Sequence, residues 1–120
     1  MEIPGEGPEV GSRSDLAAAF DAGPPARIAL AVFTSEGCAV CRTLGPAVDY
    51  FGRDPLVALR RFDEHRDVAA WRALDVPGSP YAVALGLDGT VLAKGTFNSL
   101  GQLESVLATA ERRGREAVDV

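Results

Sequence analysis

The stretch FTSEGCAVCR (residues 33–42) holds both cysteines of the chain, Cys38 and Cys41, with two residues between them. It overlaps the end of a continuous apolar run, RIALAVFT (27–34), which has the length and composition of a strand covered on both faces. It leads into CAVCRTLGPAVDYFGRD (38–54), whose apolar residues recur at helical spacing. The pair is therefore expected at the start of a helix that directly follows a buried strand.

This position predicts different roles for the two cysteines. Residues at i and i+3 on a helix share one face, close enough for a disulfide. Cys38, at the first helical residue, meets free backbone N–H groups and the positive end of the helix dipole, and both stabilise a thiolate. Cys41 lies one turn deeper and is shielded. We therefore expect Cys38 to attack a substrate disulfide and Cys41 to resolve the mixed disulfide.

Two other uses of the pair were weighed. A structural zinc ion needs four ligands, and the chain offers two cysteines and one histidine, His65, so no metal site is expected within one chain. A zinc ion shared between two chains has no positive support. A buried structural disulfide that exchanges no electrons with other proteins remains an alternative, although a disulfide that closes so short a loop adds little stability.

The remaining patterns predict an α/β fold. The expected order is helix, strand, helix, strand, helix, strand, strand, helix, with Asp88-Gly89 turning the last hairpin and Ser99 and Gln102 forming a capping box. This order gives a mixed sheet of four or five strands with helices on both faces. The expected elements are a helix over 14–23, strands over 27–34 and 56–62, helices over 38–54 and 66–75, strands over 81–87 and 90–97, and a helix over 98–114. Residues 1–13 are expected to be a flexible N-terminal arm, 14–114 a single domain and 115–120 a C-terminal tail.

Composition narrows the function. The 120 residues suffice for one domain, and 47% apolar with 24% charged residues is a balance typical of soluble globular proteins. A net charge of -5 argues against nucleic acid as the main partner. No apolar run is long enough to span a membrane, and we expect a monomer. A cytoplasmic location is expected if the chain is complete, and an extracytoplasmic one if an N-terminal anchor has been removed.

Several motifs resemble the thioredoxin superfamily over about residues 26–111. The strand ALAVFT leads into C-A-V-C, and Pro46 stands at the spacing of the family's helix-kinking proline. DVPGSP (75–80) matches the family's cis-proline loop, LDGTVLAKG (87–95) matches its last hairpin, with Gly95 at the family's glycine, and LGQLESVL (100–107) matches its last helix.

The resemblance implies a thiol–disulfide oxidoreductase without a cofactor, which acts on protein thiols and disulfides and exchanges electrons with a donor or acceptor protein. It implies a cis Pro80 facing the cysteines and a Ser79 backbone that pairs with an extended substrate segment. The residues that flank the first cysteine, Gly37, Ala39 and Val40, complete the expected substrate-binding surface. An alternative is a binding module that uses the same groove and whose cysteines act as a redox switch.

Within the superfamily, residues 76–107 look most like the methylamine dehydrogenase maturation thioredoxins and, more loosely, the TlpA/ResA group. There are departures from thioredoxin itself. Val32 stands where a buried aspartate assists the second cysteine, and Leu59 replaces a nearby lysine. Gly37 replaces the usual tryptophan, and Ala39-Val40 replaces Gly-Pro. We therefore expect a specialised client rather than fast general disulfide reduction.

Overall fold

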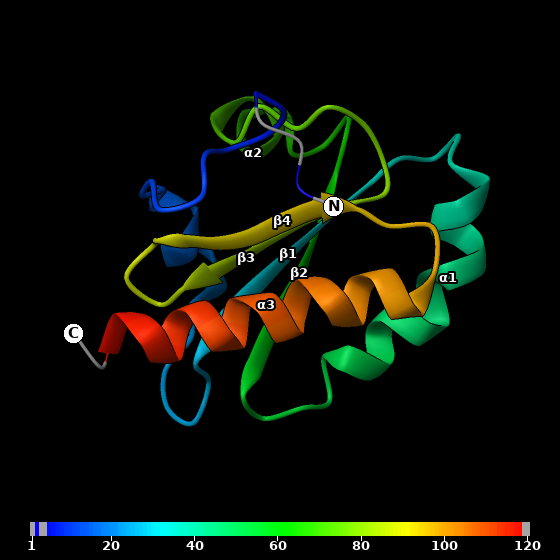
Figure 1. Cartoon of the computed structure of the whole chain (residues 1–120). Coiled ribbons are helices and arrows are strands. Elements are labelled where there is room, and N and C mark those ends of the chain that lie inside the picture. The colour runs from blue at the N-terminus through cyan, green and yellow to red at the C-terminus, as the bar shows by residue number, and fades with distance from the viewer. Residues whose placement is uncertain (1, 3–4, 119–120) are drawn as a thin grey trace.

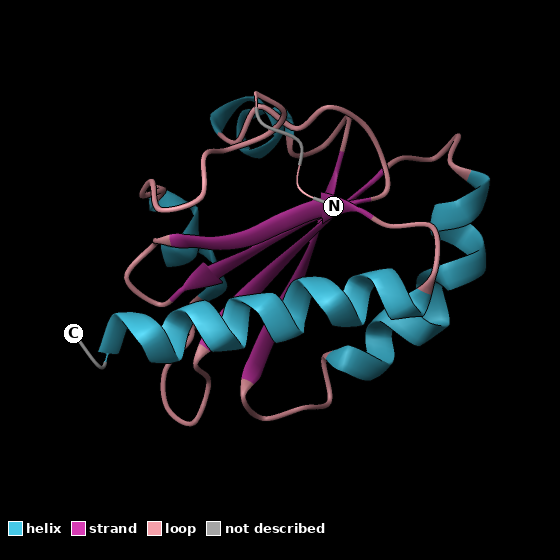
Figure 2. Ribbon diagram, viewed as in Figure 1, coloured by secondary structure: helices cyan, strands magenta, loops and turns pink. Residues whose placement is uncertain are grey.

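The computed structural model describes residue 2 and residues 5–118, which form one four-stranded sheet with helices on both faces (Figures 1 and 2). The strand order is β2-β1-β3-β4. Within these residues, no helix is long and apolar enough to cross a membrane. The elements, in chain order, are the 3-10 helix η1 (Asp15–Phe20), β1 (Ile28–Thr34), α1 (Ala39–Phe51), β2 (Val57–Asp63), α2 (Val68–Ala73), β3 (Tyr81–Gly86), β4 (Val91–Thr96) and α3 (Leu100–Val118).

The sheet is mixed, as the sequence predicts. Strand β1 lies in the middle, parallel to β2 and antiparallel to β3, and β3 is antiparallel to β4. The first six residues of β1 are buried, which agrees with an apolar run covered on both faces. The β3–β4 turn is made at Gly89, where φ is +92° and an added Cβ would lie 2.4 Å from the carbonyl oxygen of Ser14. The expected Asp88-Gly89 hairpin is confirmed.

Two apolar layers fill the two faces of the sheet. Helices α1 and α3 cover one face, over a cluster that includes Leu30, Val32 and Leu103. Helix α2 and η1 cover the other face, where Trp71 stands edge-on to Phe33 at 5.6 Å and donates its indole N–H to the Phe62 carbonyl oxygen. Strand β1 is thus packed on both faces by apolar side chains. The loop that follows its C-terminal end therefore begins at a well-packed position.

Several element boundaries differ from those expected. Helix α2 spans only six residues, so its inward face is short: Ala70 and the C-cap residue Leu74 are buried, whereas Val68 is 41% exposed. Helix α3 continues to Val118, so residues 115–118 of the expected C-terminal tail are helical. Residues 119–120 of that tail lie outside the described residues.

The N-terminal arm, residues 1–13, lies against the outer edge of β4 in its described part. Gly11 and Ser12 exchange backbone hydrogen bonds with Val91, both of 2.8 Å, and Arg13 forms a β-bridge with Thr90. Backbone hydrogen bonds therefore hold part of the arm against the sheet. Its flexibility stays a prediction, and residues 1, 3 and 4 lie outside the described residues.

Candidate redox site

Both cysteines stand at the N-terminus of α1, on the loop that leaves the C-terminal end of β1. They are joined by a disulfide, with their Cα atoms 5.2 Å apart. Cys38 is half-buried, whereas Cys41 is 9% exposed and faces the interior. The structure therefore places the pair where the sequence predicts, with the second cysteine the more shielded of the two.

The helix terminus gives Cys38 an electropositive environment. Cys38 is the N-cap residue of α1, and its Sγ accepts the backbone N–H of Cys41 at 3.1 Å. The first turn of the helix carries no acidic side chain. Free N–H groups and the helix dipole favour a negative charge at this position, so a Cys38 thiolate would be stabilised.

The Ser79–Pro80 loop lies beside the cysteine loop. Phe33 of β1 pairs with Tyr81 of β3, which brings the preceding residue, Pro80, level with the end of β1. The Ser79–Pro80 peptide bond is cis, and Pro80 is buried. The hydroxyl groups of Ser79 and Ser35 are hydrogen-bonded at 2.8 Å, so one direct contact joins the two loops.

Ser35 is a site residue that sequence reasoning did not assign. Its hydroxyl contacts Ser79, and its carbonyl oxygen accepts the N–H of Cys38 at 3.2 Å, so it contacts both halves of the site. Its partner is 44 residues away in the chain. A single serine in a loop carries no periodicity or spacing that reveals a distant partner, and only the fold brings the two together.

The other expected substrate-binding residues surround the disulfide on the surface. Gly37 and Ala39 are exposed, and Val40 is half-buried. An added Cβ at Gly37 would have no neighbour within 4 Å, so the surface next to Cys38 is open. This openness is compatible with a protein substrate approaching the disulfide from this side.

Among the residues that the structure describes, no acid is buried behind Cys41. Val32 is fully buried, and Leu59 packs against the same apolar cluster, so the two departures noted in the sequence give this interior a uniformly apolar character. Within the described residues, Lys94 is the one charged side chain that is buried, and it lies on β4 rather than near α1. Glu36, close to the pair in sequence, is exposed.

Metal ligands do not gather at this site. In residues 2 and 5–118, no three His, Cys, Asp or Glu side chains come close enough to hold a metal ion. His65 is exposed and follows β2.

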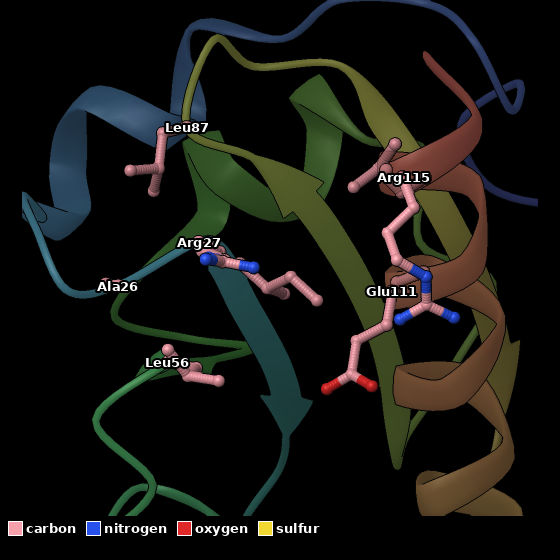
Figure 3. A pocket seen from close by; sticks show the side chains of 10 residues that line it. Ala26, Arg27, Leu56, Leu87, Glu111 and Arg115 are labelled. Carbon is pink, nitrogen blue, oxygen red and sulfur yellow. The ribbon is translucent and has the colours of Figure 1, made fainter. Parts of the chain in front are cut away.

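A hollow in the described structure lies at the end of the sheet opposite the cysteines (Figure 3). It has a volume of about 690 Å³ and is bordered by the start of β1, the β3–β4 turn and the last turns of α3. Leu56 and Leu87 line it, with Arg27 and Arg115 among its polar residues. None of the expected site residues borders it, so we do not assign it to the redox chemistry.

Comparisons with known proteins agree with this architecture. A mutant thioredoxin from Halobacterium salinarum NRC-1 superposes with a TM-score of 0.63 and 20% identity, covering 92% of this chain and 96% of that one. A thioredoxin from Fasciola hepatica gives 0.64 and 22%, covering 72% and 81%. The oxidised mitochondrial thioredoxin 3 from Saccharomyces cerevisiae gives 0.63 and 17%, covering 76% and 83%. A search of protein-family models gives no match, and neither does a search of curated proteins.

These likenesses show the fold. The chain has the α/β thioredoxin fold, with a mixed four-stranded sheet, flanking helices and a C-x-x-C disulfide at the start of α1. The expected fold class is therefore confirmed.

Proposed function

We propose that the protein is a thiol–disulfide oxidoreductase that exchanges electrons with cysteines of other proteins. The observation that carries the proposal is the position of the pair: a half-buried Cys38 at a helix N-cap and a shielded Cys41 one turn below it. The cis Ser79–Pro80 loop, hydrogen-bonded to the cysteine loop, supplies a backbone segment beside the cysteine loop. Pairing of a substrate segment with that backbone is strand addition.

In the reducing direction, the Cys38 thiolate attacks one sulfur of a client disulfide. A Cys38–client bond forms, the client S–S bond breaks, and the second client sulfur leaves as a thiolate that takes up a proton. The Cys41 thiolate then attacks the Cys38 sulfur, closes the Cys38–Cys41 disulfide and releases the first client sulfur. The client gains two electrons, which the pair loses; the oxidising direction is the reverse sequence.

Trapping separates the roles of the two cysteines. With Cys41→Ser, the mixed disulfide at Cys38 has no resolving thiol, so we expect covalent client adducts in non-reducing mass spectrometry. Cys38→Ser should give few or none. Insulin reduction or thiol oxidation should fall at least about 100-fold in both variants, because both halves of the exchange are needed. Unchanged rates in both variants would refute the enzymatic role.

The resemblance of residues 76–107 to methylamine dehydrogenase maturation and TlpA/ResA proteins supports a finer proposal, a specialised client. The apolar interior around Val32 favours it as well, because it provides no acid to move protons at Cys41. The same feature favours a second candidate, a binding module whose affinity is switched by the disulfide. That module would turn over slowly and bind its partner differently when oxidised and reduced; equal affinity in the two states would exclude it.

A further inference from the structure

Part of the outer edge of β4 is already covered by the N-terminal arm, which pairs with it through residues 11–14. Val91 donates its N–H to Ser12 and accepts the N–H of Gly11, and Ser14 donates to the Gly89 carbonyl oxygen, each at 2.8 Å. An uncovered edge strand presents unpaired N–H and C=O groups to any extended chain. The arm thus shows that this edge can pair with the backbone of another segment.

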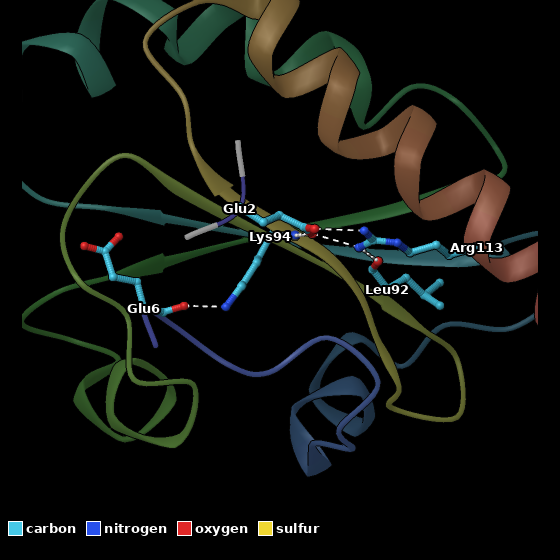
Figure 4. A network of polar contacts seen from close by, with 5 residues as sticks. All are labelled: Glu2, Glu6, Leu92, Lys94 and Arg113. Atoms are coloured by element: carbon cyan, nitrogen blue, oxygen red, sulfur yellow. Dashed lines mark hydrogen bonds and ion pairs between the residues drawn. The ribbon is translucent and has the colours of Figure 1, made fainter. Parts of the chain in front are cut away.

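A carboxylate site lies further along the same edge (Figure 4). Both oxygens of Glu2 accept hydrogen bonds from Arg113, each at 2.8 Å, and one also accepts the backbone N–H of Lys94 at 3.3 Å. Arg113 is itself held by a 2.8 Å hydrogen bond to the Leu92 carbonyl oxygen. Such two-pronged binding is geometrically specific. The hydrogen bonds from Arg113 lower the pKa of Glu2, and the same contacts raise the pKa of Arg113.

Lys94, the single lysine of the chain, lies beneath the arm. Its side chain is on an edge strand, yet the residue is only 6% exposed, and its ammonium group donates to the Glu6 carbonyl oxygen. The edge therefore carries two positive groups in a protein of net charge -5. The complementary segment is acidic.

The arm also covers the residue that follows the cis-proline loop. Gly7 has a φ of +66°, and an added Cβ would lie 2.4 Å from the hydroxyl oxygen of Tyr81. Tyr81 is 3% exposed, and its burial raises its pKa to about 12. Because Tyr81 directly follows Pro80, the arm at Gly7 comes close to the platform assigned to the substrate backbone.

We propose that the β4 edge, with Arg113 and Lys94, is a second binding site for the client, which takes an extended acidic segment in place of the arm. This rests on the proposed function, since it supposes a protein client. The arm is replaceable because polar contacts hold it: Val10, its one large apolar side chain among the described residues, is 40% exposed. Polar contacts contribute little net free energy each, because water replaces them.

Tethering makes the exchange feasible. The arm is attached to the domain and so reaches the edge at an effective concentration on the order of millimolar. A free segment cannot easily compete with that. A client held at Cys38 by a mixed disulfide is tethered too, so its acidic segment competes with the arm on similar terms.

The test uses a fluorescent peptide with the sequence of residues 1–14 and the full-length oxidised protein. Gly7→Ala should expel the arm, because the added Cβ meets the buried Tyr81 ring. We expect the peptide to bind Gly7→Ala at least fivefold more tightly than the unaltered protein. Gly5→Ala is the matched control: Gly5 also has positive φ, but an added Cβ meets nothing within 4 Å, so peptide binding should stay as in the unaltered protein.

Two further measurements define the site. Adding Arg113→Gln to Gly7→Ala, or replacing Glu by Gln in the peptide, should weaken binding about tenfold. Acylation of Lys94, located by mass spectrometry, should be about tenfold faster in Gly7→Ala and slow again when peptide is added.

If Lys94 is acylated fast in Gly7→Ala, the arm has left the edge. If the peptide then fails to bind, the arm is only a structural cover, and the proposal is overturned. The proposal is also overturned if peptide affinity changes neither with Arg113→Gln nor with replacement of Glu by Gln in the peptide. Neither result bears on disulfide exchange, because the assay involves no turnover. Conversely, loss of the oxidoreductase function would leave peptide binding measurable.

Discussion

At the scale of single residues, Val32 shows that the interior below the cysteines is apolar. It is fully buried and packs in the cluster with Leu30 and Leu59. The sequence was enough to predict this, because a strand of continuous apolar residues must be covered on both faces. The cost of burying a charge at this position can be tested by placing a carboxyl group there.

Val32→Asp should lower the free energy of unfolding by about 3–5 kcal/mol at neutral pH, because an ionised carboxylate would lie buried without a partner. Burial raises the folded-state pKa of such a carboxyl above its unfolded value of about 3.9. The part of the stability loss that comes from the charge is therefore absent below the unfolded pKa and grows as pH rises toward the folded pKa. Urea unfolding from pH 3 to 8 measures this. Val32→Asn is the control and should show a pH-independent loss relative to the unaltered protein; an equally flat Val32→Asp profile would contradict the argument.

At the scale of elements, helical and strand patterns predicted every element, but not where each one stops. The sequence predicted that the last helix ends at Gly114. Helix α3 instead continues to Val118, because a glycine is tolerated inside it. Helix α2 (Val68–Ala73) is shorter than the helix predicted over residues 66–75. The Ser35–Ser79 contact was not predictable, since hydrogen bonds between loops depend on the assembled sheet rather than on local spacing.

Two glycines with different backbone conformations, Gly114 inside helix α3 and Gly89 in the β3–β4 turn, should respond oppositely to the same change. Gly114→Ala should raise the free energy of unfolding by about 0.5–1 kcal/mol, since glycine disfavours a helix and the new Cβ would meet Leu92 at an ordinary 3.7 Å. Gly89→Ala should lower it by more than about 1 kcal/mol, because φ is +92° and the Cβ would strike the Ser14 carbonyl oxygen. Urea midpoints with an unchanged slope measure both. The same sign for both substitutions would show that the local geometry does not govern them.

At the scale of the whole molecule, the N-terminal arm and the last helix meet at β4. Glu2 and Arg113 are 111 residues apart, and their side chains are each 29% exposed, so their pairing links the arm to the last helix over the sheet edge. Sequence periodicity could not predict this, because the arm has no apolar pattern and its contacts are polar. The thioredoxin fold, by contrast, follows from local patterns that all agree with one another.

This link should make the arm sensitive to acid. Hydrogen bonds from Arg113 lower the folded-state pKa of Glu2 below its usual 4.5, so the pairing contributes fully above that value and is lost as pH falls through the folded pKa. Amide exchange followed by NMR and corrected for intrinsic rates should show the Lys94 amide, which donates to Glu2, losing protection in that range. The amide of Val83, in the interior of the sheet, should keep its protection. Glu2→Gln should leave Lys94 weakly protected at every pH, because a neutral amide cannot replace the carboxylate on Arg113. A Lys94 profile that follows Val83 throughout would mean that the charge of Glu2 does not hold the arm.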